Sequence, residues 1–276
     1  MTTRTITPQE YDEFRGFLEK ACGIVLGDNR HYLVTSRLSR LMTDQAIDSF
    51  SALVKQANAN RVLKEYILDA MTTNETSWFR DTYPYEILKT ELLPELCKHA
   101  GMSIRIWSAA CSTGQEPYSI SMVIQEFLMK NPGVLKKSVE IIATDISSAI
   151  IKEAESGVYD GIALVRGLSE ERKQRFFRPL PGNAKWEVKK EIRERVKFRT
   201  FNLMENYASL GRFDIVFCRN VLIYFSHNLK KDILARIARS LQPGGYLLLG
   251  GSETISGYSS EFEMVRGKVG TLYRLI

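Results

Sequence analysis

The chain has 276 residues, 44% of them hydrophobic, and a formal net charge of +6. This length suits one large domain or two unequal ones, and the composition is that of a globular protein with a sizeable core. No apolar run approaches the roughly 20 residues of a membrane span, and the N-terminus has no apolar segment typical of a secretory signal. We therefore expect a cytoplasmic protein that does not insert into membranes. The four cysteines form no CxxC pair and the three histidines form no cluster, so we expect free thiols and no metal site.

The first 72 residues are predicted to be all-helical. Thr7-Pro8-Gln9-Glu10 matches a capping box with proline at the first helical position, and Gly23 offers a stop for the helix that follows. Apolar residues recur at helical spacing in three further segments, 30–43, 48–57 and 61–71. Because no strand pattern occurs here, we expect a small helical domain over residues 1–72.

The predicted helix over residues 30–43 carries a basic face formed by Arg30, Arg37 and Arg40, and the first acid after them is Asp44. Such a face can simply be solvated, or it can dock an acidic surface. The net charge alone does not choose between nucleic acid, a membrane surface and an acidic protein as the partner.

Residues 72–80, with the sequence TTNETSWFR, interrupt the helical pattern. The segment is polar, then aromatic, then basic, and a simple connector would not need Trp78 and Phe79. It is either a hinge with an aromatic anchor or a segment that folds over a ligand. A further helix is predicted over residues 83–99.

From residue 104 onward, strand patterns alternate with helix patterns. Strands are predicted over 104–108, 139–144, 213–217 and 246–249, and helices over 117–128, 147–156 and 229–241. This alternation is typical of a doubly wound α/β fold with a mostly parallel sheet. We therefore place a second domain over residues 73–276, which ends in a predicted hairpin over 263–276.

Residues 185–201 have a different texture, because apolar and charged residues alternate. Trp186, Val188, Ile192, Val196 and Phe198 fit half-exposed antiparallel strands. We therefore predict a small antiparallel β insertion at about residues 178–201. A charged helix is the alternative for the middle of this segment, since Glu and Lys are good helix formers.

The stretch IRIWSAACSTGQEPYS (104–119) predicts a buried strand, a small-residue turn and the start of a helix, the unit that builds nucleotide-type sites in doubly wound folds. Only Gly114 occupies the turn, and Asp145 lies 31 residues beyond it, where a dinucleotide fingerprint places its acid after roughly 20. A pyrophosphate would be poorly held, whereas Asp145 could accept both hydroxyls of a ribose. These features favour a nucleoside without phosphates, such as S-adenosylmethionine. Other candidates at strand ends are Asn202, Asn220 and Tyr224.

Six longer motifs occur along the chain: NETSWFR (74–80), RIWSAACSTGQEPYSI (105–120), ATDI (143–146), FNL (201–203), FDIVFCRNVLIYF (213–225) and LQPGGYLLLGGSE (241–253). With these motifs, in this order, the chain resembles the chemotaxis receptor glutamate methyltransferases, the CheR family. The resemblance implies an N-terminal helical domain and a Rossmann-like methyltransferase domain with a small inserted β subdomain. The reaction that it implies moves the methyl group of S-adenosylmethionine to glutamate side chains on the cytoplasmic helices of chemoreceptors.

The resemblance also implies a site, in which Arg80 and Tyr224 would line the place of methyl transfer. Each position has a structural alternative: a surface arginine with a packed stem for Arg80, a core residue for Tyr224, a helix N-cap for Asp145 and a first-turn charge for Glu116. The implied cofactor contacts are Asn74, Thr76, Arg80, Glu116, Asp145, Asn202, Leu203, Arg219 and Asn220.

Two departures from the family pattern matter. The family often has two adjacent acids before Pro-Tyr-Ser; here the first is Gln115, and we expect Glu116 to suffice. Some members carry a glycine-rich loop that grips a C-terminal tether peptide of the receptor, whereas the corresponding PLPGNAKWEVKK has one glycine. We therefore doubt tether binding and expect direct recognition of the receptor body. We also expect the protein to be a monomer.

Two other functions fit parts of the sequence. A nucleic-acid methyltransferase would suit the positive charge, but methylation of base amino groups normally uses an Asn/Asp-Pro-Pro-aromatic turn, and the segment RNVLIYF has no proline. A non-catalytic signalling module that only binds S-adenosylmethionine is the other alternative, and the presence of both Arg80 and Tyr224 argues against it.

Overall fold

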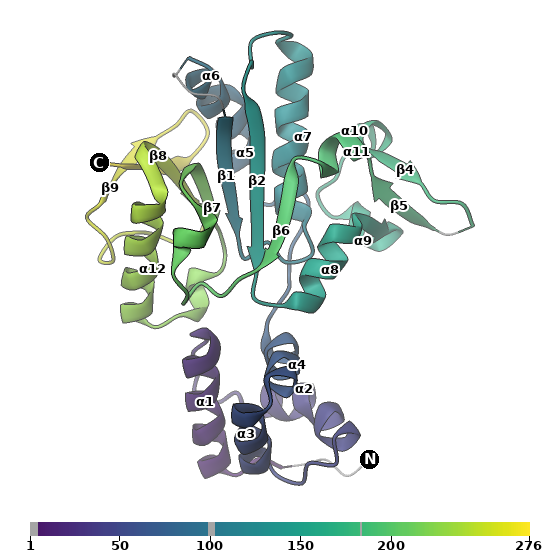
Figure 1. Ribbon diagram of the computed structural model, residues 1–276, viewed down its shortest axis with the longest axis vertical. Coiled ribbons are helices and arrows are strands. Elements are labelled where there is room, and N and C mark those ends of the chain that lie inside the picture. The colour runs from purple at the N-terminus through teal and green to yellow at the C-terminus, as the bar shows by residue number, and fades with distance from the viewer. Residues whose placement is uncertain (1–4, 99–102, 183) are drawn as a thin grey trace.

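The computed structural model describes residues 5–98, 103–182 and 184–276. The N-terminal helices α1 to α4 form one group, which lies below a larger domain built on a twisted sheet (Figure 1). A small second sheet projects from one side of that domain. Within the described ranges, no helix is long and apolar enough to cross a membrane.

The helical domain consists of α1 (Pro8–Cys22), α2 (His31–Asp44), α3 (Phe50–Ala59) and α4 (Arg61–Met71). The predicted capping box begins α1: Thr7 Oγ1 accepts from the Glu10 N–H at 3.2 Å, and the Glu10 carboxylate accepts from the Thr7 N–H at 3.0 Å. The helix ends at Gly23, whose φ of +79° suits glycine. The four helices bury a core of their own, which includes Leu38. The predicted all-helical domain is therefore confirmed.

The segment between the two domains is anchored by its aromatic residues. Trp78 and Phe79 are both buried, and the Trp78 indole N–H donates to the Ala163 carbonyl at 2.9 Å. The predicted helix over 83–99 consists of α5 (Tyr83–Ile87), the π-helical turn η1 (Leu88–Leu92) and α6 (Leu93–Leu96). Its predicted end at residue 99 lies outside the described residues.

The central sheet has seven strands in the order β6-β2-β1-β7-β8-β10-β9. The parallel strands are β6 (Val196–Thr200), β2 (Ser138–Asp145), β1 (Ser103–Ala109), β7 (Phe213–Cys218) and β8 (Leu241–Leu249). The predicted terminal hairpin, β9 (Phe262–Arg266) and β10 (Thr271–Leu275), adds two antiparallel strands. β8 begins earlier than the predicted residue 246, because Leu241 already pairs with Phe213. The strand order reverses between β1 and β7, which is where doubly wound sheets form their ligand crevice.

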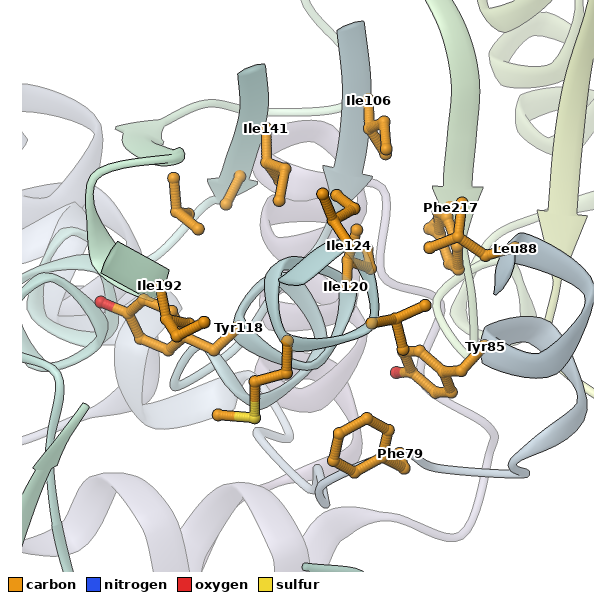
Figure 2. Close-up of a cluster of buried hydrophobic side chains, with 14 of the residues drawn as sticks. Phe79, Tyr85, Leu88, Ile106, Tyr118, Ile120, Ile124, Ile141, Ile192 and Phe217 are labelled. Atoms are coloured by element: carbon orange, nitrogen blue, oxygen red, sulfur yellow. The ribbon is translucent and has the colours of Figure 1, made fainter. Parts of the chain in front are cut away.

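Helices cover both faces of this sheet. On one face, Ile106 of β1 and Phe217 of β7 pack with Ile120 of α7 (Gln115–Lys130), as Figure 2 shows. Neighbouring strand residues point the opposite way, so Trp107 packs with Ile233 of α12 (His227–Ser240) in a second core. Helix α8 (Ser148–Ser156) follows β2. The predicted doubly wound α/β fold is confirmed.

The small sheet is antiparallel, as predicted, with the strand order β3-β5-β4. Its strands are β3 (Val158–Asp160), β4 (Phe177–Pro179) and β5 (Lys185–Val188), and the short helices around it are α9 (Gly161–Val165), α10 (Glu170–Phe176) and α11 (Lys190–Arg193). The presence of α11 means that the helical alternative is correct for the middle of residues 185–201.

The prediction of an antiparallel strand was wrong for the last part of that segment. Strand β6 belongs to the central sheet and runs parallel to β2, with Val196 opposite Ile141 and Phe198 opposite Ala143. The Phe198 ring packs on Tyr118 of α7 at a centroid distance of 5.5 Å, whereas Lys197 and Arg199 are exposed. An edge strand that is covered on one face shows the same alternation as a half-exposed hairpin, so the pattern alone did not separate the two.

Candidate active site

A cavity of about 590 Å³ lies where the carboxyl ends of β1, β2, β6 and β7 meet the helical domain. This volume is in the usual range for small-molecule sites. Both domains line it, together with the segment that joins them. The ten residues that the sequence analysis assigned to catalysis or cofactor binding all line this one cavity. They are Asn74, Thr76, Arg80, Glu116, Asp145, Asn202, Leu203, Arg219, Asn220 and Tyr224.

The turn after β1 has the strained backbone expected of a functional site. Ala110 and Ser112 have φ values of 59° and 50°, in the left-handed region that side chains disfavour. Gly114, with φ of 93°, could not be replaced easily, since a Cβ there would lie 3.0 Å from the Tyr159 hydroxyl and 3.1 Å from the Ala154 Cβ. The turn is therefore packed closely against the side chains of Tyr159 and Ala154, and its small residues leave room for a ligand.

Asp145, the last residue of β2, is buried at the cavity wall. Its Oδ2 accepts from the Ser112 N–H at 2.9 Å and its Oδ1 from the Ser147 N–H at 3.1 Å. Burial raises the pKa of Asp145 above the usual value, although the hydrogen bonds from backbone N–H groups oppose the shift. The N-cap alternative is wrong, because Ser147 caps α8 by accepting from the Ile150 N–H.

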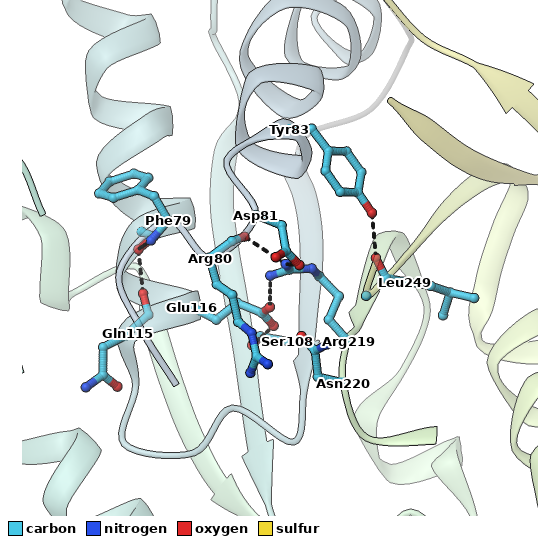
Figure 3. A network of polar contacts seen from close by, with 12 residues as sticks. Phe79, Arg80, Asp81, Tyr83, Ser108, Gln115, Glu116, Arg219, Asn220 and Leu249 are labelled. Atoms are coloured by element: carbon cyan, nitrogen blue, oxygen red, sulfur yellow. Dashed lines mark hydrogen bonds and ion pairs between the residues drawn. The ribbon is translucent and has the colours of Figure 1, made fainter. Parts of the chain in front are cut away.

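Glu116 and Arg219 form a buried ion pair (Figure 3). Arg219 Nη1 donates to Glu116 Oε2 at 2.9 Å, and Nη2 donates to Asp81 Oδ2 at 2.7 Å. The other Glu116 oxygen accepts from the Ser108 hydroxyl at 2.8 Å. Burial alone would lower the pKa of Arg219, whose side chain is 1% exposed, but the charges and hydrogen bonds around it, led by those of Glu116, together outweigh burial and raise that pKa. Arg219 therefore stays charged, and its Nε is buried without a hydrogen-bond partner among the described residues.

The same ion pair holds the loop that carries Arg80. Arg219 Nη2 also donates to the Arg80 carbonyl at 2.7 Å, and the Phe79 N–H donates to the Ser119 hydroxyl at 3.1 Å. This support matters because Phe79, Asp81 and Thr82 all have positive φ, at 49°, 65° and 54°. The Arg80 guanidinium itself makes one hydrogen bond in the described chain, to the Glu75 carbonyl at 3.1 Å. Its remaining N–H groups can therefore serve a ligand.

Tyr224 lies at the boundary of the two domains. It ends the 3-10 turn η3 (Leu222–Tyr224), and its carbonyl accepts from the Val25 N–H at 2.9 Å. The next residues pair in the same way, since Ile24 and Phe225 form an isolated antiparallel bridge. Ile24 also packs against both the helical core and the sheet core. The segment after α1 therefore fixes the position of Tyr224.

Asn202 and Leu203 extend this boundary. The Asn202 amide donates to the Ala21 carbonyl at the end of α1 at 3.0 Å, and its oxygen accepts from the Met204 N–H at 3.0 Å. Leu203 is buried in the core under α12. Both line the cavity, but the side chain of Asn202 already connects the two domains.

Asn220 depends on a residue to which the sequence interpretation gave no role. Asn220 has φ of 57°, and its N–H donates to Glu253 Oε2 at 2.6 Å. The other Glu253 oxygen accepts from the Leu222 N–H at 2.8 Å. Glu253 therefore holds the backbone on both sides of Val221. The only signal was its place at the end of the motif LQPGGYLLLGGSE.

Comparison with known proteins identifies the family. Residues 74–271 match the family model described as "CheR methyltransferase, SAM binding domain", and residues 9–72 match "CheR methyltransferase, all-alpha domain". The chain belongs to the CheR methyltransferase family. It is 55% identical to chemotaxis protein methyltransferase 1 of Pseudomonas aeruginosa, over 96% of this chain and 97% of that one. It is also 52% identical to the chemotaxis protein methyltransferase of Vibrio parahaemolyticus, over 100% of both chains.

As a CheR methyltransferase, the chain uses S-adenosylmethionine as its cofactor, which agrees with the interpretation of the turn after β1. Among solved structures, the N-methyltransferase NodS from Bradyrhizobium japonicum, in complex with S-adenosyl-L-homocysteine, is 14% identical, with a TM-score of 0.38 over 72% of this chain and 91% of that one. That likeness is too distant to bear on function. No group of three or more metal-ligating side chains occurs in the part of the chain that the structure describes.

Two buried thiols, those of Cys22 and Cys111, line the cavity. Burial raises the pKa of Cys22 to about 11, and it raises the pKa of Cys111 well above its usual value. Since the thiolate is the nucleophile, both side chains stay protonated and unreactive near neutral pH.

The basic face predicted on α2 is only partly available to a partner. Arg37 is turned inward, where Nη1 donates to the carbonyls of Met71 at 2.8 Å and Thr72 at 3.0 Å. It therefore satisfies the C-terminal carbonyls of α4, and it remains half-buried at the cavity lining. Arg40, in contrast, is 93% exposed and Arg30 is exposed at the cavity rim. These contacts of Arg37 were not predicted, because a periodic pattern does not show which carbonyls lie within reach of a long side chain.

A further group of residues that the sequence interpretation missed comes from the helical domain. Cys22, Ile24, Val25 and Leu33 all line the cavity. They end α1, follow it or lie in the first turn of α2, where no motif or charge pattern marks them. Their role arises only from the packing of the two domains.

Proposed function

We propose that this CheR methyltransferase transfers the methyl group of S-adenosylmethionine to glutamate side chains on the cytoplasmic helices of chemoreceptors, forming glutamyl methyl esters. The observation that carries the proposal is the shared cavity, which has Asp145 and the strained turn on its wall together with Arg80 and Tyr224. The family's chemotaxis members support it as well. The setting is the sensory adaptation of a cytoplasmic signalling system.

The reaction needs alignment more than acid–base help. A glutamate is ionised near neutral pH, so one carboxylate oxygen can attack the methyl carbon without a general base. The C–O bond forms as the C–S bond breaks, and the electron pair stays on sulfur, which leaves neutral S-adenosyl-L-homocysteine. The attacking oxygen must lie about 3–3.5 Å from the methyl carbon and in line with the sulfur. No proton has to move at any step.

Arg80 and Tyr224 are the residues that we assign to this alignment. The free N–H groups of Arg80 can hold the incoming carboxylate by charge-assisted hydrogen bonds. The Tyr224 hydroxyl can hold the second carboxylate oxygen or the methyl-bearing end of the cofactor. The backbone contact between Val25 and Tyr224 and the ion pair below Arg80 keep both groups pre-organised.

For the cofactor, we propose that Asp145 accepts from the ribose hydroxyls. Asn74, Thr76, Asn202, Leu203 and Asn220 would line the rest of its site, next to Arg80. Glu116 and Arg219 would act mainly through each other, since the ion pair already engages them. We further propose that the chain divides at residues 72 and 73 and that the enzyme acts as a monomer without help from a receptor tether.

Transfer of tritiated methyl groups tests this function. The full chain is incubated with methyl-labelled S-adenosylmethionine and a receptor cytoplasmic fragment, and the label is then exposed to mild base. A carboxyl ester releases the label as methanol, and a fragment without the acceptor glutamates should take up none. Base-stable label, label on nucleic acid, or cofactor binding with no transfer to any receptor fragment would contradict the proposal.

A further inference from the structure

Two exposed apolar side chains flank Tyr224 at the mouth of the cavity. Val25 is 42% exposed and Ile223 is 50% exposed, and both line the cavity. They come from different domains, but the hydrogen bond from the Val25 N–H to the carbonyl of Tyr224, the residue after Ile223, joins their two segments. We call this pair the apolar ridge.

Two arginines line the same cavity as the ridge. Arg30 is exposed and Arg80 is half-buried. The mouth therefore combines an apolar strip with two arginines, which complements a partner that is apolar and acidic on a single face.

An α-helix has a diameter of about 10–12 Å with its side chains, so a helical acceptor cannot enter a cavity of about 590 Å³. Only the acceptor side chain can enter, and the body of the helix must rest on the rim. Residues three or four apart lie on one face of a helix. A glutamate that reaches Arg80 therefore brings its neighbours on that face against the rim.

We propose that the apolar ridge of Val25 and Ile223 is a docking surface for the acceptor helix, and that it binds apolar side chains on the same face as the acceptor glutamate. This inference rests on the function proposed above. The ridge adds affinity for the helix, whereas Arg80 and Tyr224 align the carboxylate that reaches the cavity.

The test compares the full-length Val25→Asn, Ile223→Asn double variant with wild type in methylation of a receptor fragment. Replacing both side chains should raise KM for the fragment about tenfold, and this rise should exceed any fall in kcat. Affinity for S-adenosyl-L-homocysteine, measured by calorimetry, should change less than about twofold. The apolar Val25→Leu, Ile223→Leu variant should restore KM, and Ile223→Asn alone should give a smaller increase if the double variant is unstable.

Val62 is a matched control, because it is apolar, 58% exposed and lies on α4 outside the cavity lining. Val62→Asn should leave KM unchanged. A wild-type KM in the double variant, or an equal rise in Val62→Asn, would overturn the inference. It would also be overturned if sedimentation showed that the ridge joins two copies of the chain and that the double variant separates them. If the wild type methylates no receptor fragment, the proposed function fails first.

Discussion

The two walls of the cavity are built by different means. On the sheet side, the charged side chains of Asp145 and Arg219 are buried and that of Glu116 is only 12% exposed, and each is held by hydrogen bonds or ion pairs. On the helical side, the contacts to Tyr224 are made by the backbone, and side chains such as Val25 stay partly exposed. The first wall suits a cofactor that must be held in one geometry, and the second suits an acceptor that must arrive and leave.

The sheet wall should be the more sensitive to substitution. Asp145→Asn removes the charge that we assign to the ribose hydroxyls, and hydrogen bonds to a charged group are worth about 1.5–3 kcal/mol each. We expect affinity for S-adenosyl-L-homocysteine, measured by calorimetry, to fall about 100-fold or more. Asp160→Asn, at the exposed N-cap of α9, is a control that should bind normally. An unchanged affinity in Asp145→Asn would remove the ribose role.

The same carboxylate predicts a pH dependence. Burial raises the pKa of Asp145, so it takes up a proton at a higher pH than an ordinary aspartate as the pH falls. The neutral carboxyl accepts less well from ribose hydroxyls. Affinity for the cofactor should therefore decrease as the pH is lowered, beginning above the range in which exposed aspartates titrate. The Asp145→Asn variant should lose this dependence.

Tyr224 tests the place where the two walls meet. Tyr224→Phe keeps the ring and the backbone contact to Val25 but removes the hydroxyl. We expect kcat for receptor methylation to fall about 100-fold, as when a donor is removed from a pre-organised site. Affinity for the cofactor should stay nearly the same. A wild-type rate would exclude the hydroxyl from the mechanism.

Substitution of Arg37 tests whether its hydrogen bonds to the last carbonyls of α4 stabilise the helical side of the cavity. Arg37→Gln removes the charged donors to the last carbonyls of α4, which should lower the free energy of unfolding by about 2 kcal/mol. Arg40→Gln is the matched control, since its exposed pair with Asp44 should contribute less than about 0.5 kcal/mol. Urea unfolding measures both. Equal stability of the two variants would mean that Arg37 is a surface residue after all.

The smallest predicted effect is the coupling between Ile24 and Tyr224. If Ile24 acts by positioning Tyr224, Ile24→Ala should reduce kcat about fivefold in the wild type and hardly at all in the Tyr224→Phe background. Leu53→Ala, in the helical core, should have the same effect on kcat in both backgrounds. Fully additive effects of Ile24→Ala and Tyr224→Phe would show that the contact is only structural.

The sequence predicted the sheet wall better than the helical wall, and the reason is physical. The turn after β1 and Asp145 follow from local patterns, because a parallel sheet brings strand ends to one edge. The pairing of Glu116 with Arg219 joins residues far apart in the chain, and neither residue type specifies its partner. The contact of Val25 with Tyr224 uses backbone groups that every residue has. Such contacts depend on how the two domains pack against each other, and no periodic pattern in a single sequence indicates that packing.

The most direct measurement is a crystal structure of the full chain with S-adenosyl-L-homocysteine. We predict that the ligand lies in the cavity between the domains, with its ribose hydroxyls within hydrogen-bond distance of Asp145. Its sulfur should face the space beside Arg80 and Tyr224. A ligand bound elsewhere, such as in the open groove between Tyr118 and the small sheet, would contradict the account. So would a sulfur turned away from Tyr224.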